Sequence, residues 1–83
     1  MFTVPELEEI RTLAYDKRAD LEQHIETMGQ ISEALGRGEL VMMFAPGDAG
    51  IRAARDMTAT FKARIERVTV IIEKTERELG FSE

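Results

Sequence analysis

Apolar residues recur at alternating spacings of three and four in two stretches of this chain, and this periodicity restricts the fold more than any other feature. Such a repeat places the side chains on one stripe of an α-helix, as in a coiled coil. The chain is therefore predicted to form two long helices that pack along these stripes. The first stripe contains Leu7, Ile10, Ala14, Lys17, Leu21, His24, Met28, Ile31 and Leu35; the second contains Ile51, Ala54, Thr58, Phe61, Ile65, Val68, Ile72, Thr75 and Leu79.

The predicted first helix spans residues 4–35 and begins with a recognisable signal. Thr3 and Glu6 have the spacing of a capping box, in which each side chain bonds the backbone amide of the other residue. Phe2 and Leu7 flank the box at the positions of a hydrophobic staple. Gly36 follows the stripe and is expected to adopt the left-handed conformation that commonly ends a helix.

The predicted second helix spans residues 48–79. Asp48 is the expected N-cap, and Leu79-Gly80-Phe81 fits a Schellman-type stop in which Phe81 turns back onto the last turn. With residues 36–47 as connector, the whole chain, 1–83, is expected to be one all-α domain, an antiparallel two-helix hairpin.

Folding the chain so that Leu35 meets Ile51 gives a register that the remaining sequence can test. This register pairs His24 with Phe61. It also brings Asp20 near Arg64 and Arg11 near Glu76, two pairs of opposite charge that were not used to choose it. Lys17, a polar stripe residue, is expected to reach Asp16, Asp20 or a partner carboxylate.

Self-association is the expected source of additional stability, because a chain of 83 residues without cysteine has neither a large core nor disulfides. Apolar side chains beside the stripes would be buried in the contact between protomers, and a C2 dimer is the commonest closed assembly. We therefore expect a four-helix bundle or a larger oligomer. The expected oligomer interface contains Leu13, Ile25, Met57 and Ile71.

The connector is longer than most helix–helix links and contains an unbroken apolar run, residues 40–45. One interpretation is that the run folds over the open end of the hairpin. The other is that it is a docking tip, since neighbouring methionines give an adaptable surface for protein partners. The expected partner-binding residues are Leu40, Val41, Met42, Met43 and Phe44.

Basic residues concentrate in the second helix and give an alternative function. An oligomer could sequester a small anionic ligand such as a nucleotide at its protomer interfaces. A small acidic chain of that kind would suit a phage or mobile element that blocks a host signal. The candidate anion-binding residues are Arg52, Arg55, Lys62, Arg64 and Arg67, which lie on several faces of one helix and do not converge within a single chain.

Catalysis, metal binding and cofactor binding receive no support from the sequence. No motif for them is present, the carboxylates are solvent-facing, and one histidine with a neighbouring aspartate is too sparse for a metal site. The net charge of −5 disfavours nucleic-acid binding, although Rop-like RNA-binding hairpins share the architecture with a shorter turn. The sequence shows no signal peptide and no membrane-spanning stretch, so a cytoplasmic location is expected.

The sequence thus predicts a non-enzymatic interaction module, a small acidic adaptor, inhibitor or assembly factor. It would bind a protein partner and copies of itself through its connector and through the apolar side chains beside the stripes, here called the apolar flank.

Overall fold

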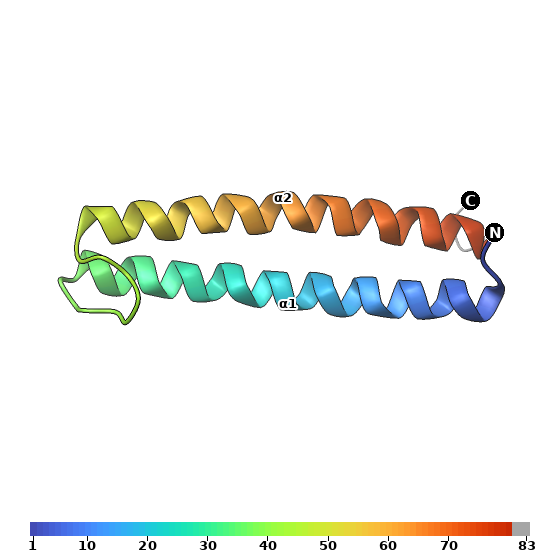
Figure 1. Ribbon diagram of the computed structural model, residues 1–83, viewed down its shortest axis with the longest axis horizontal. Helices are drawn as coiled ribbons and strands as arrows, with labels where there is room; N and C mark the ends of the chain where they lie inside the picture. The colour runs from blue at the N-terminus through green and yellow to red at the C-terminus, as the bar shows by residue number, and fades with distance from the viewer. Residues whose placement is uncertain (81–83) are drawn as a thin grey trace.

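Two antiparallel helices make up the fold in the computed structural model, which describes residues 1–80 (Figure 1). Helix α1 spans Val4–Gly36 and helix α2 spans Asp48–Glu78. No strand occurs within residues 1–80. The predicted all-α hairpin is therefore confirmed. The hairpin is 52 Å long and 18 Å across in both other directions. Both described ends of the chain lie at one end of the hairpin, and the connector lies at the other.

The core is a single row of side chains between the helices. On α1 the buried residues recur every seven positions, at Leu7, Ala14, Leu21, Met28 and Leu35. On α2 the buried residues include Ala54, Ile72 and Thr75. The Thr75 hydroxyl is satisfied locally, because it donates to the Ile71 carbonyl oxygen at 2.7 Å. A two-helix core therefore tolerates a polar seam residue without an unpaired hydroxyl.

The helix ends confirm some of the predicted signals and correct others. Thr3 and Glu6 form the capping box: the Glu6 amide donates to the Thr3 hydroxyl, and the Thr3 amide donates to the Glu6 carboxylate. At the other end of α1, Gly36 is still helical and Gly38, not Gly36, adopts the left-handed conformation, with φ +83°. The Gly38 amide donates to the Leu35 carbonyl and the Glu39 amide to the Ala34 carbonyl, which completes a Schellman motif two residues later than predicted.

At the start of α2, the N-cap is Gly47 and Asp48 is the first helical residue. No side chain caps this end, so Asp48 stabilises it through the helix dipole rather than as the expected cap. Gly80, with φ +81°, follows the end of α2 as predicted. The expected contact of Phe81 lies outside the described residues.

Two contacts across the seam agree with the predicted register. The rings of His24 and Phe61 meet edge to face, with centroids 5.3 Å apart, and Arg11 pairs with Glu76 at 2.8 Å. The expected Asp20–Arg64 pair is wrong. Asp20 instead lies 3.8 Å from both Lys17 and His24 on its own helix, where neighbours one turn apart meet without reaching across the hairpin.

Candidate functional site

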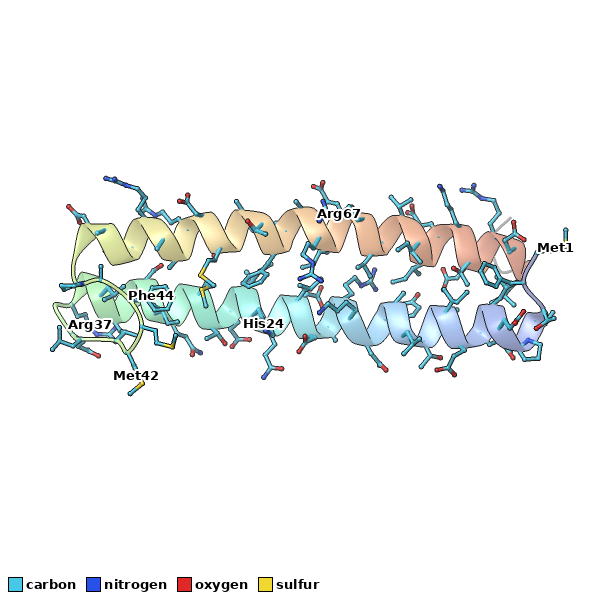
Figure 2. The ribbon with its side chains drawn as sticks, viewed as in Figure 1. Met1, His24, Arg37, Met42, Phe44 and Arg67 are labelled. Atoms are coloured by element: carbon cyan, nitrogen blue, oxygen red, sulfur yellow. The ribbon has the colours of Figure 1, made fainter. Side chains whose placement is uncertain are left out.

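The connector presents apolar side chains to solvent at the tip of the hairpin. Leu40, Met42 and Met43 are 85%, 87% and 95% exposed, whereas Val41 and Phe44 are half-buried. Figure 2 shows Met42 pointing away from both helices. The two interpretations of the run therefore apply to different residues: Val41 and Phe44 turn inwards, and the other three form an exposed apolar patch, here called the tip.

A tight turn holds the tip in place. The Phe44 amide donates to the Val41 carbonyl at 3.1 Å, and Met43, third in this turn, has φ +71°. A positive φ at the third position is typical of a type II turn, which normally places glycine there. For a residue with a side chain this conformation costs about 1–2 kcal/mol. The turn thus keeps a large, exposed methionine at a position where glycine would be less strained.

The connector is also anchored to both helices. At its start, the Schellman motif is reinforced by an ion pair in which Arg37 donates to Glu39 at 2.7 Å. At its end, Gly50 is buried beneath the Ala45 carbonyl. A Cβ at position 50 would overlap that oxygen and lie 2.8 Å from Leu35 Cδ1. Gly50 was missed in the sequence, although a glycine in the first turn of a helix costs propensity and signals a packing reason.

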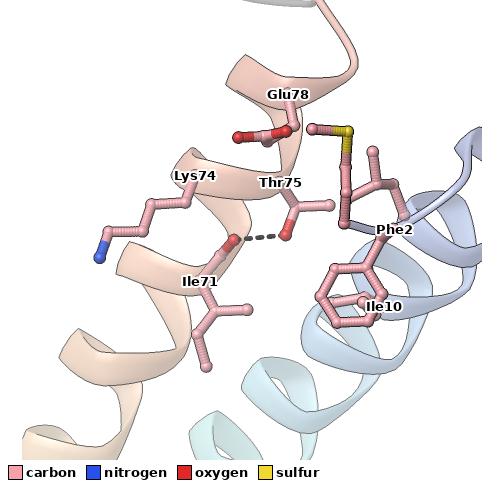
Figure 3. A pocket seen from close by; sticks show the side chains of 8 residues that line it. Phe2, Ile10, Ile71, Lys74, Thr75 and Glu78 are labelled. Carbon is pink, nitrogen blue, oxygen red and sulfur yellow. Dashed lines mark hydrogen bonds between the residues drawn. The ribbon is translucent and has the colours of Figure 1, made fainter.

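An apolar hollow of about 450 Å³ opens between the helices at the opposite end (Figure 3). Phe2 and Ile10 form one wall, and Ile71 and Thr75 form the other. Its remaining lining residues are Met1, Leu7, Lys74 and Glu78. The staple pair Phe2 and Leu7 contributes to this hollow, which the apolar periodicity alone does not predict.

The hollow marks one long side of the hairpin, here called the open face. Leu13 lies one helical turn beyond Ile10 on α1, and Met57 lies in the same seven-residue row of α2 as Ile71. These three predicted interface residues, Leu13, Ile71 and Met57, are 59%, 46% and 40% exposed. The open face therefore carries large apolar side chains that the hairpin alone does not cover.

The opposite side, here called the closed face, is sealed by a polar cluster. Arg11 Nε and the Tyr15 hydroxyl both donate to Glu76 Oε2 at 2.8 Å, and the Arg11 and Arg18 guanidinium groups lie 4.9 and 5.0 Å from the Tyr15 ring centroid. The two hydrogen bonds, that from Arg11 first, hold the pKa of Glu76 below its usual range. Ile25 continues the row of Arg11 and Arg18, so it lies on this face, apart from the other predicted interface residues.

The predicted anion-binding residues are all exposed and are spread around α2. Arg55 and Lys62 share the row of Glu76 on the closed face, while Arg64 shares the row of Ile71 on the open face. Arg52 and Arg67 lie outside both of these rows. The five residues therefore form no common pocket within one hairpin.

His24 is half-exposed at the edge of the seam. Its Nδ1 lies 2.7 Å from the Asp20 carbonyl oxygen, which anchors the ring against Phe61. Within residues 1–80, no group of three or more His, Asp or Glu side chains is placed to hold a metal ion. Among the described helices, neither combines the length and apolar character needed to cross a membrane.

Comparison with protein-family models, with curated proteins and with solved structures found no match for this chain.

Proposed function

We propose that this protein is a non-enzymatic interaction module, a small acidic adaptor, inhibitor or assembly factor that captures a protein partner with its tip. The exposure of Leu40, Met42 and Met43 on an anchored turn carries this proposal. Soluble proteins rarely leave contiguous apolar side chains exposed without a contact to make. Methionine suits such a contact because its flexible, polarizable side chain adapts to the surface that it meets.

The anchoring of the connector supports binding rather than simple exposure. The Arg37–Glu39 ion pair and the buried Gly50 hold both ends of the connector before any partner arrives. Binding then loses less conformational entropy than it would from a free loop. The strained backbone at Met43 also supports a preorganised binding surface, because strain of this kind persists only where the surrounding structure enforces it.

Self-association completes the proposal. A compact monomer of 9.4 kDa would expose about 5,000 Å². This chain exposes 6156 Å², about 1,100 Å² more. A standard interface buries about 800 Å² on each partner. The surplus is thus large enough for a second copy to cover the open face and form a four-helix bundle.

A photocrosslinker tests partner capture directly. Benzoylphenylalanine replacing Met42 should yield one discrete adduct with a protein in the cells from which the chain derives. The same group replacing Glu26, an exposed residue at mid-length of α1, is the control and should not yield that adduct. The substitutions Leu40→Ser and Met43→Ser, made together, should abolish it while helicity is unchanged, because both side chains are solvent-exposed. The same adducts from positions 42 and 26, or none from position 42, would contradict a docking tip.

A further inference from the structure

The open face carries segregated charge beside its apolar side chains. Along α1, the exposed charges on its outer edge are acidic: Glu9, Asp16 and Asp20, here called the acidic rim. Lys17, nearer the seam, is the basic exception on α1 and lies 3.8 Å from Asp20. Along α2, the exposed charges on the corresponding edge are basic: Arg64, Arg67 and Lys74, here called the basic rim. Glu78, at the end of α2, is an acidic exception in this half and lies one turn from Lys74. The rims therefore have opposite signs on the two helices of one face.

Both rims occupy the same half of the hairpin. The Arg11–Glu76 and His24–Phe61 contacts fix the register, which places Lys74 at a level between Glu9 and Asp16. It likewise places Arg67 between Asp16 and Asp20. In the half nearer the connector, the same edges carry few charges; on α2 the exception is Asp56, which lines a hollow with Met57 and Thr60. The edges otherwise carry Gln23, Thr27 and Gln30 on α1, and Ala53, Met57 and Thr60 on α2.

We propose that a second copy of this chain covers the open face about a two-fold axis parallel to the helices. In this arrangement α1 of each protomer lies on α2 of the partner at the same level. The acidic rim then meets Arg67 of the partner subunit and Lys74 of the partner subunit, and the halves nearer the connector, which carry few charges, meet each other. Turning the second copy end for end would lay α1 on α1 and α2 on α2. The acidic rim would then meet uncharged residues and the basic rim would meet only Asp56 of the partner subunit, which forfeits most of this complementarity.

The dimensions of the face and its continuity with the connector agree with this occupant. A hairpin 52 Å by 18 Å presents about 900 Å², close to the area that each partner of a standard interface buries. Gly50, which supports the end of the connector, shares the seven-residue row of Met57, Arg64 and Ile71. The connector therefore leads directly onto the face that the second copy covers.

A functional consequence follows for the tip. Both connectors lie at the same end of such a dimer, so Met42 and Met43 of two protomers form one composite docking surface. This inference rests on the self-association part of the proposed function and deepens it. The site for a protein partner is then complete only in the dimer, and a monomeric variant would offer half of it.

Spin-label distances test the arrangement. The sequence contains no cysteine, so Met42→Cys and, separately, Glu8→Cys each provide one labelling site per chain. The parallel axis predicts distances between the two labels below about 35 Å for both variants, since two hairpins 18 Å across lie side by side. An end-for-end dimer would give about 50 Å for both, near the length of the hairpin.

The three outcomes are distinguishable. Short distances support the arrangement. Long distances with a dimeric mass overturn it while leaving self-association intact, and they would set each tip near the hollow of the other copy. A monomeric mass at every concentration overturns both this inference and the self-association part of the proposed function.

Charge reversal provides a second test with a matched control. Arg67→Glu with Lys74→Glu reverses the basic rim and should weaken dimerisation about tenfold at low salt, less at high salt. Arg55→Glu with Lys62→Glu changes the net charge equally on residues outside the open face and should weaken it less than about threefold. Equal weakening in both variants would contradict a specific role for the rims.

Discussion

Gly50→Ala should destabilise this protein, although alanine normally stabilises a helix relative to glycine. Gly50 is the third residue of α2, and there is no space for a Cβ because the Ala45 carbonyl oxygen occupies it. The Leu35 side chain, 2.8 Å away, could adjust by rotation. The carbonyl belongs to the backbone, so relief requires the end of the connector to move.

The magnitude follows from two opposing effects. Replacing glycine by alanine in a helix gains at most about 1 kcal/mol, and overpacking a filled site costs about 1–3 kcal/mol. Because the obstructing atom is backbone, we expect the upper part of that range and a net loss of about 1–2 kcal/mol. Gly29 is the matched control, since a Cβ there meets nothing within 4 Å. Gly29→Ala should therefore gain about 1 kcal/mol.

Thermal and urea unfolding followed by circular dichroism would measure both variants at one fixed protein concentration, because association shifts apparent stability. Each kcal/mol corresponds to a Tm change of about 4–8 °C in a domain of this size. The two glycine substitutions should shift Tm in opposite directions. Stabilisation of both variants would refute the packing of the connector on α2.

Three further substitutions test other parts of the structure. Met43→Gly should raise stability by up to about 1 kcal/mol by relieving the positive φ, whereas Met42→Gly, at a residue with negative φ, should not; urea midpoints would compare them. Glu76→Gln should lower the urea midpoint at pH 7. Since the folded-state pKa of Glu76 is depressed, the carboxylate stabilises the fold fully above about pH 4.3 and less as pH falls through the folded-state value, so the difference from the unmutated protein should shrink on acidification. A difference that stays constant from pH 7 into the acid range would contradict the carboxylate's role. Leu21→Ala removes a side chain that is 1% exposed and should cost about 2–5 kcal/mol, and a loss under 1 kcal/mol would argue against a single-row core.

The sequence was sufficient for features that depend on periodicity and local chemistry. The stripes, the capping box at Thr3 and the His24–Phe61 and Arg11–Glu76 contacts all follow from fixed spacings on two antiparallel helices. These features can be predicted without knowing the backbone path of the connector, because the helical repeat of 3.6 residues per turn determines which side chains face the partner helix.

Other features depend on the path of the backbone between the helices. Gly50 is required only because the connector returns across the start of α2, and no local pattern specifies that return. The left-handed glycine that ends α1 is Gly38 and not Gly36, because the backbone hydrogen bonds of the Schellman motif form two residues later than expected. Asp20 lies near Lys17 and His24 on its own helix and does not pair with Arg64. The competing contacts have similar, small energies, so residue spacing alone does not predict which of them forms.

The polar cluster on the closed face was the most consequential feature that the sequence left open. Spacing alone places Leu13, Met57 and Ile71 on one flank and Ile25 on the other, but it does not show that side chains seal the flank of Ile25. Tyr15 seals that flank, because its hydroxyl and its ring join Arg11, Arg18 and Glu76 in one cluster. The aromatic ring beside two arginines was visible in the sequence, but its partner across the hairpin was not.

Light scattering across a concentration series at neutral pH is the most direct test of a hairpin whose open face is covered by a second copy. The measured mass should be twice the 9.4 kDa of the chain and should fall when Leu13→Glu and Ile71→Glu place charge on that face. Ile25→Glu, on the closed face, should leave the mass unchanged. A mass of 9.4 kDa at every concentration, with helicity intact, would contradict self-association through the open face.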